Sequence, residues 1–304
     1  MVGSRHEPVE CKTVDQTILR GLFFAANGPA PIIIMSHGFN CVKEMTLPEI
    51  AESFQASGYN ALIYDARSVG ASEGFPRNLL NPLQMAEDLS DIVTFTTTLP
   101  TVDARRILLW GMSFGGMVSG ICSTLDRRIR GVAMVCPLFS FVTDQKRKTV
   151  LAQCIKDRTS QLRGNEAYTL QPFNSRGENP AGMGGSGGPG GVEAYNLMQA
   201  AAELGHPGFR NRIALQTYLK LVLARPKEII ELLEDVPVFM VIPELDDISA
   251  PAEQQELFDK LNVKKRLYLA KGKGHLSIMT GDGSVELIES TKQFFSDALE
   301  GKLR

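Results

Sequence analysis

At residues 107–116 the chain reads Ile107-Leu108-Leu109-Trp110-Gly111-Met112-Ser113-Phe114-Gly115-Gly116. The apolar run at its start has the length of a buried strand, and residues 117–122 have the composition of a buried helix. A Gly-x-Ser-x-Gly motif between a strand and a helix predicts a nucleophile elbow, the sharp turn that lifts a serine hydroxyl clear of a sheet. The alternative is a glycine-rich turn that only packs a helix onto the sheet. The context favours Ser113 as a nucleophile, with the Phe114 N–H facing the point where negative charge would develop.

Composition and charge exclude several classes of function. The chain is long enough for one large α/β domain or for two. Its formal net charge is −2 and its basic residues form no block, so nothing favours nucleic acid or an anionic membrane as a partner. No apolar run approaches the ~20 residues that span a bilayer. Residues 1–7 lack the apolar core of a signal peptide, and residues 301–304 are no clear peroxisomal signal, so we expect a cytoplasmic protein.

The cysteines and histidines give no sign of a metal site. The five cysteines are an odd number without metal-type spacing, and three of them fall in or beside apolar runs. We interpret them as reduced, mostly buried thiols. The histidines are equally scattered along the chain, so we predict neither a metal nor a cofactor. The cysteines are Cys11, Cys41, Cys122, Cys136 and Cys154, and the histidines are His6, His37, His206 and His275.

Strand and helix patterns alternate through most of the chain. Residues 9–24 predict a hairpin, and the apolar runs at 32–35, 59–64, 131–136 and 238–242 are typical of strands covered on both faces. A last strand is expected at 265–270, and helices at 47–57, from 82 onward, at 252–261 and at 285–299. This alternation predicts a mostly parallel central sheet with helices on both faces, an α/β fold.

A long insertion interrupts the alternation after the strand at 131–136. It is too long for one crossover helix and has helix-like stretches near 148–162, 192–204, 212–224 and 227–233. We expect residues 139–235 to form a helical cap over the sheet, and residues 1–138 and 236–304 to form the core domain. The glycine-rich run at 181–191 predicts a flexible loop within the cap. It does not follow a strand in a βαβ unit, so a phosphate site there is not favoured.

A serine nucleophile needs a base and a group that orients the base. Where a serine stands on a nucleophile elbow, the acid and then the histidine follow it along the chain. His275 alone follows the predicted last strand, in a Gly-x-Gly-His turn, so it is the expected base.

The acid is expected at the end of the strand 238–242, where Asp246 and Asp247 are adjacent. The spacing Asp-x-apolar-x-x-Pro favours Asp246, and Asp247 would then be a solvated neighbour or a cap for the helix after Pro251. Asp247 stays open as the alternative, and Glu244 is a more remote candidate.

Two further loops follow predicted strands. The turn Ser36-His37-Gly38-Phe39-Asn40 predicts a second oxyanion donor, the backbone N–H of Phe39, beside that of Phe114. For the His37 side chain we expect a hydrogen bond within the loop. In the loop at 65–74, we expect Asp65 and Arg67 to form a charge pair that orders the loop, and a catalytic role for them is the alternative.

These motifs together resemble the α/β-hydrolase superfamily over essentially the whole chain. The cap sequences Glu193-Ala194-Tyr195 and Gly208-Phe209-Arg210-Asn211-Arg212 are similar to fungal hydrolases of polyketide gene clusters, the polyketide transferase/thiohydrolase group. The resemblance implies an α/β-hydrolase fold, with Ser113, Asp246 and His275 acting on an ester or thioester through an acyl-enzyme. The implied partners are a small-molecule acyl ester or an acyl-carrier thioester, including an acyl carrier domain of a polyketide synthase. The glycine run is longer than the group leads us to expect.

Fold does not fix the reaction, so two other functions stay open: a non-hydrolytic rearrangement or C–C cleavage in the same pocket, and ligand binding without turnover. The cap helices carry apolar and aromatic residues suited to a long, apolar acyl group. Tyr195, Phe209 and Tyr218 are the expected substrate-binding residues among them, and Leu197 and Met198 belong to the same set.

Overall fold

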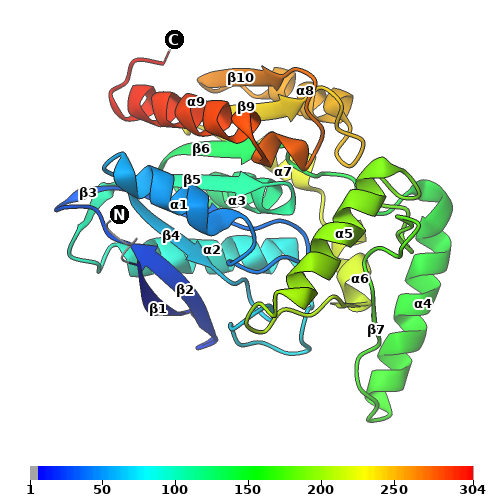
Figure 1. Ribbon diagram of the computed structural model, residues 1–304. Helices are drawn as coiled ribbons and strands as arrows, with labels where there is room; N and C mark the ends of the chain where they lie inside the picture. Colours follow the sequence, from blue (N-terminus) through cyan, green and yellow to red (C-terminus); the bar gives the residue numbers. More distant parts are fainter. Residues whose placement is uncertain (1–5, 304) are drawn as a thin grey trace.

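The computed structural model describes residues 6–303. Its central element is a mostly parallel, eight-stranded sheet (Figure 1). The first two strands in space are antiparallel at one edge, and the later strands are parallel to one another. This confirms the predicted α/β fold class. The expected core domain extends past this range, and its residues 1–5 and 304 lie outside the described part. In spatial order the strands are β1 (His6–Lys12), β2 (Ile18–Phe24), β4 (Asn60–Tyr64), β3 (Ala30–Ser36), β5 (Val102–Met112), β6 (Ile129–Val135), β9 (Val238–Pro243) and β10 (Lys265–Ala270).

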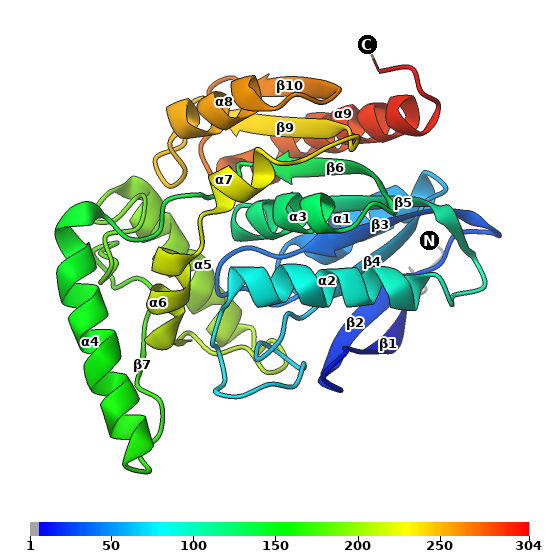
Figure 2. The same cartoon turned by 180° about the vertical axis from the view of Figure 1, so that it is seen from behind.

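Both faces of the sheet are covered by helices. Successive side chains of a strand point to opposite faces, so β5 contributes Leu109 to one core cluster and Trp110 to the other. The Leu109 face packs against α2 (Pro82–Thr96) and α3 (Phe114–Leu125), which are in front in Figure 2. The Trp110 face packs against α1 (Leu47–Ala56) and α9 (Asp282–Leu299). Burial on both faces explains why these strands are continuous apolar runs.

The segment between β6 and β9 lies at the end of the sheet where the parallel strands finish (Figure 1). Its last helix returns to the sheet layer, because Ile230 packs against Gly120 of α3. No helix within residues 6–303 combines the length and the apolar character that a membrane span needs. The elements of this segment are α4 (Asp144–Leu162), β7 (Thr169–Leu170), α5 (Pro189–Glu203), β8 (Ile213–Ala214), α6 (Gln216–Leu223) and α7 (Pro226–Ile230).

The glycine run at 181–191 differs from the loop that its composition predicts. Its C-terminal end is helical, because α5 begins at Pro189, a residue type suited to the first turn of a helix. The preceding turn is hydrogen-bonded, with the Gly191 N–H donating to the Gly185 carbonyl at 3.0 Å. A Cβ on Gly184 would lie 1.6 Å from the carbonyl oxygen of Ile248. Close packing against the loop after β9 is therefore one role of these glycines.

The expected charge pair between Asp65 and Arg67 is wrong, since each side chain has other partners. The buried Asp65 carboxylate accepts hydrogen bonds from the Lys43 Nζ and from the Lys43 backbone N–H, both at 2.8 Å. Arg67 instead pairs with Asp88 and Asp15. Asp65 therefore ties the loop after β4 to the loop after β3, where Phe39 lies.

Asp65→Ala should lower the free energy of unfolding by about 3–5 kcal/mol, because it leaves the buried Lys43 ammonium with Glu44 as its one acidic neighbour. Asp15→Ala is the matched control, since Asp15 is largely exposed and Arg67 keeps Asp88. The control should cost under about 1 kcal/mol in urea unfolding. Equal losses in the two variants would contradict the role of Asp65.

Candidate active site

The Ser113 backbone has the strained geometry of a nucleophile elbow. Its φ of 56° and ψ of −117° place it between the end of β5 and the start of α3. The turn is possible because two glycines flank it: a Cβ on Gly111 would lie 2.2 Å from the Gly115 carbonyl oxygen, and one on Gly115 would lie 2.2 Å from the Ser36 carbonyl oxygen. Strand, turn and helix thus meet at distances that exclude any other residue at these two positions.

Three side chains predicted from separate parts of the chain form one hydrogen-bonded series. The His275 Nε2 lies 2.8 Å from the Ser113 Oγ, and its Nδ1 lies 2.9 Å from the Asp246 Oδ2. All three residues are buried. An ionised carboxylate only accepts hydrogen bonds, so the Nδ1 donates to Asp246 and the Nε2 is left to accept the Ser113 proton.

The two adjacent aspartates point to different partners. The Asp246 Oδ1 accepts the backbone N–H groups of Ile248 at 2.9 Å and Ser249 at 2.8 Å, and these bonds orient its carboxylate toward His275. The Asp247 carboxylate instead accepts the Gly190 N–H at 2.9 Å. Glu244 is exposed and accepts the Gly272 N–H. Among the three candidate acids, the geometry places Asp246 against the histidine.

Phe39 and Phe114 lie side by side next to Ser113. Phe114 opens helix α3, where the first N–H groups have no partner within the helix. The rings of Phe39 and Phe114 meet edge to face, with centroids 5.6 Å apart, and Phe141 packs against both. This ring cluster holds the loop after β3 against the elbow.

The His37 side chain joins two loops. Its Nε2 accepts the Ala66 N–H at 3.2 Å, and its Nδ1 lies 3.0 Å from the Gly38 carbonyl oxygen. Burial lowers the pKa of His37, so the ring is neutral at pH 7. These contacts agree with the expected hydrogen-bonding role.

Two opposing effects set the protonation of His275. Burial disfavours the imidazolium, but the hydrogen bond to the Asp246 carboxylate favours it, and the pKa of His275 is raised above its ordinary value. Burial also raises the pKa of the Cys136 thiol. A histidine stabilised in this way holds a proton well once it has received one.

One group of side chains in the described part of the chain has potential metal-ligand atoms within 4.8 Å of one another. It consists of Cys136, Asp246 and His275. His275 and Asp246 already use these atoms on each other. The thiol is buried and protonated at neutral pH, whereas a metal binds the thiolate. The arrangement therefore fits proton transfer better than metal binding. The five cysteines are free and buried, as expected.

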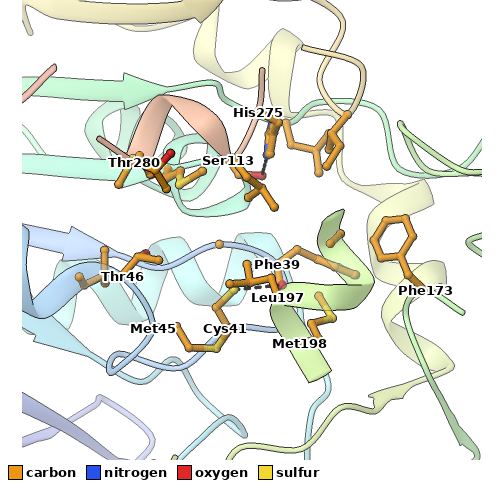
Figure 3. A pocket seen from close by; sticks show the side chains of 18 of the residues that line it. Phe39, Cys41, Met45, Thr46, Ser113, Phe173, Leu197, Met198, His275 and Thr280 are labelled. Carbon is orange, nitrogen blue, oxygen red and sulfur yellow. Dashed lines mark hydrogen bonds between the residues drawn. The ribbon is translucent and has the colours of Figure 1, made fainter. Parts of the chain in front are cut away.

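A cavity of about 130 Å³ borders Ser113 and His275 (Figure 3). Its walls are mostly apolar and come mainly from the loop after β3, the segment between β6 and β9, and residues 276–280, with Met112 of β5 and Ile248 of the loop after β9. Cys41 and Thr46 contribute from the first of these parts, and Phe173 and Leu197 from the second. Sulfur is prominent, with Met45, Met112, Met183, Met198 and Met279 in the lining.

The three residues expected to bind substrate, Tyr195, Phe209 and Tyr218, are not among those that line this cavity. Tyr218 is fully buried, and its hydroxyl accepts a hydrogen bond from Asn179 at 3.2 Å. Tyr195 and Phe209 are partly buried against the core. The helical phase explains the difference on α5: Leu197 and Met198 turn toward the cavity, whereas Tyr195 is on a neighbouring face.

Sequence reasoning missed other cavity residues. Met45 and Thr46 follow directly after the predicted Phe39 turn, and that nearness was the available signal. Phe173 and Met183 had no comparable signal, because they reach the cavity through the folding of the segment between β6 and β9. Lys43, the partner of Asp65, was missed because the two residues are on the loops after different strands and meet only in the folded sheet.

The fold and this site define an α/β-hydrolase. The chain belongs to the family described as serine aminopeptidase, S33, whose model matches residues 27–280.

Fungal enzymes are similar along nearly the whole chain. A thiohydrolase of Eupenicillium brefeldianum is 43% identical over 295 residues, which cover 97% of this chain and 94% of that protein. A polyketide transferase of Aspergillus fumigatus is 36% identical over 296 residues, covering 97% and 99%. Among solved structures, DcsB in complex with its substrate analogue matches with a TM-score of 0.94 at 54% identity, covering 97% of this chain and 99% of that one. These relatives confirm the resemblance to the polyketide transferase/thiohydrolase group.

The His275 ring should titrate above pH 6.5, its ordinary value, in NMR spectra of protein labelled with ¹⁵N in its histidines. Asp246→Asn should lower this pKa, because it removes a charge that favours the imidazolium while burial still opposes it. Asp247→Asn is the matched control and should leave the titration unchanged. A larger shift in the Asp247 variant would contradict the pairing of His275 with Asp246.

Proposed function

We propose that the protein is a serine hydrolase or acyltransferase that takes a polyketide-type acyl group from an ester or thioester. The observation that carries the proposal is the hydrogen-bonded series from Ser113 through His275 to Asp246, placed at the wall of an apolar cavity. A serine hydroxyl hydrogen-bonded to an oriented imidazole is the arrangement that nucleophilic acyl transfer requires.

In this proposal Ser113 attacks the substrate carbonyl carbon while His275 Nε2 takes its proton. The backbone N–H groups of Phe39 and Phe114 stabilise the oxyanion. The carbon–sulfur or carbon–oxygen bond of the donor then breaks, and His275 returns the proton to the leaving thiol or alcohol. Water or an acceptor alcohol attacks the acyl-serine in the second half, with His275 again moving the proton. Asp246 stabilises the imidazolium in both halves.

The names of the relatives, thiohydrolase and polyketide transferase, support a polyketide acyl group as the substrate. An acyl carrier domain of a polyketide synthase is the donor we propose. Residues 139–235 would act as the cap of this site, and residues 1–138 and 236–304 as its core domain. The buried free thiols are in keeping with a cytoplasmic location.

Ser113→Ala should lower turnover by a factor on the order of 10⁴ or more, because triad residues act as a unit. Incubation with a panel of acyl thioesters should add one acyl mass to the native protein in intact-mass spectra and none to the variant. Product analysis then separates a free acid from an ester of an added alcohol. A Ser113→Ala variant that keeps more than a few per cent of the activity would favour a non-covalent rearrangement or C–C cleavage. Binding of the thioester with neither acylation nor product would favour a ligand-binding protein.

The cavity predicts a preference for longer acyl chains. Each methylene that is buried adds ~0.8 kcal/mol, so kcat/KM should rise about two- to fourfold per carbon while the chain still enters the cavity. A series of p-nitrophenyl esters from two to ten carbons measures this. Met198→Trp, which fills part of the cavity, should shorten the preferred chain. A sharp preference for the acetyl ester in the native protein would contradict an acyl site in this cavity.

A further inference from the structure

The loop that carries the triad acid also contacts the start of α5. The Asp247 Oδ2 accepts the Gly190 N–H at 2.9 Å, and Gly190 is in the first turn of α5. A carboxylate at this end of a helix satisfies one of the free N–H groups there and interacts favourably with the helix dipole. Asp246 and Asp247 are consecutive, so one short loop holds His275 on one side and α5 on the other.

The glycines before and within the first turn of α5 allow this loop to approach. A Cβ on Gly190 would lie 2.1 Å from the Asp247 Oδ1, and one on Gly184 would lie 1.6 Å from the Ile248 carbonyl oxygen. Neither glycine has a positive φ, so the backbone conformation alone does not require glycine there. What excludes larger residues is the closeness of the loop after β9.

The same contact bears on the shape of the cavity. α5 contributes Leu197 and Met198 to the wall opposite Ser113 (Figure 3). Ala194 of the same helix and Ile248 of the loop also line the cavity. Ala194 is one helical turn beyond Gly190, so a shift at the start of α5 moves the wall directly. The position of this wall decides how much room is left for an acyl chain.

We infer that Asp247 is a positioning residue, which holds the start of α5 against the triad-acid loop and thereby sets the acyl-binding wall of the cavity. This inference rests on the proposed function, since it concerns the acyl group of that reaction. Asp247 touches neither Ser113 nor His275 in this role. It acts on specificity through α5, whereas Asp246 acts on the proton through His275.

The test compares kcat and KM for acetyl and decanoyl p-nitrophenyl esters in the native protein and in Asp247→Ala. Loss of the helix contact should lower decanoyl kcat/KM by about five- to tenfold, mainly through KM, and should affect the acetyl ester far less. Asp247→Asn keeps an oxygen acceptor for the Gly190 N–H and should restore most of the decanoyl preference. Glu193→Ala is the matched control, because Glu193 is exposed on the same helix.

Gly190→Ala tests the contact from the other partner. Its methyl group would displace the Asp247 carboxylate, so this variant should show the same selective loss as Asp247→Ala. The double variant Asp247→Ala/Gly190→Ala should lose less than the product of the two single losses, because both changes remove one interaction. Independent, multiplicative losses would overturn the inference.

Intact-mass spectra separate the possible failures. If the native protein forms an acyl-enzyme and Asp247→Ala keeps the native preference for decanoyl over acetyl, the positioning role is wrong and the proposed function stands. If the native protein is not acylated by any donor, the proposed function itself is wrong. A parallel drop in both esters would show general destabilisation and would also overturn the inference. Should Asp247→Ala not fold, Gly190→Ala carries the same comparison.

Discussion

The site depends on a backbone conformation that is unfavourable for the residue that adopts it. Ser113 has a positive φ, and it keeps this conformation because β5 and α3 are packed on either side of it. The packing in turn requires glycine at 111 and 115, because a Cβ at either position would lie 2.2 Å from a backbone carbonyl oxygen. One local constraint thus fixes where the strand ends, where the helix begins and where the hydroxyl points. The loops after β3, β9 and β10 are then arranged around that hydroxyl.

This constraint explains which parts of the site could be predicted from the sequence. A buried strand, a tight turn and a helix are local patterns, and the carboxyl ends of parallel strands meet at one edge of a sheet. Ser113, Asp246 and His275 each follow such a strand, so their meeting follows from the fold class. The cavity wall is different, because its residues come from a segment whose helices are placed by tertiary packing. Tyr195, Leu197 and Met198 were all expected near the substrate, and Leu197 and Met198 line the cavity whereas Tyr195 does not, which is a difference of helical phase that composition does not contain.

The charged groups show the same limit. Asp65 and Arg67 are two positions apart and looked like partners, yet Asp65 binds Lys43 on the preceding loop and Arg67 binds Asp88 on α2. A buried carboxylate takes whichever cation the fold brings to it, because an unpaired charge in the interior is costly. Nearness in sequence is a poor guide once the loops of neighbouring strands lie closer than residues along one loop. The ion pairs of this edge therefore had to be found from the structure.

The glycine run at 181–191 is a further place where tertiary packing decides what composition does not. From composition alone, so many glycines predict a flexible loop, since glycine is the residue that restricts a chain least. In the structure Gly184 and Gly190 lie against the backbone and side chains of the loop after β9, at distances that only glycine permits. Their effect is to bring α5 and the triad-acid loop together. Because α5 also forms the wall opposite Ser113, the helix that shapes the cavity and the loop that holds Asp246 against His275 share one contact. A change at that contact would alter the shape of the cavity without touching Ser113 or His275, so under the proposed function acyl specificity would vary while the proton transfer is kept.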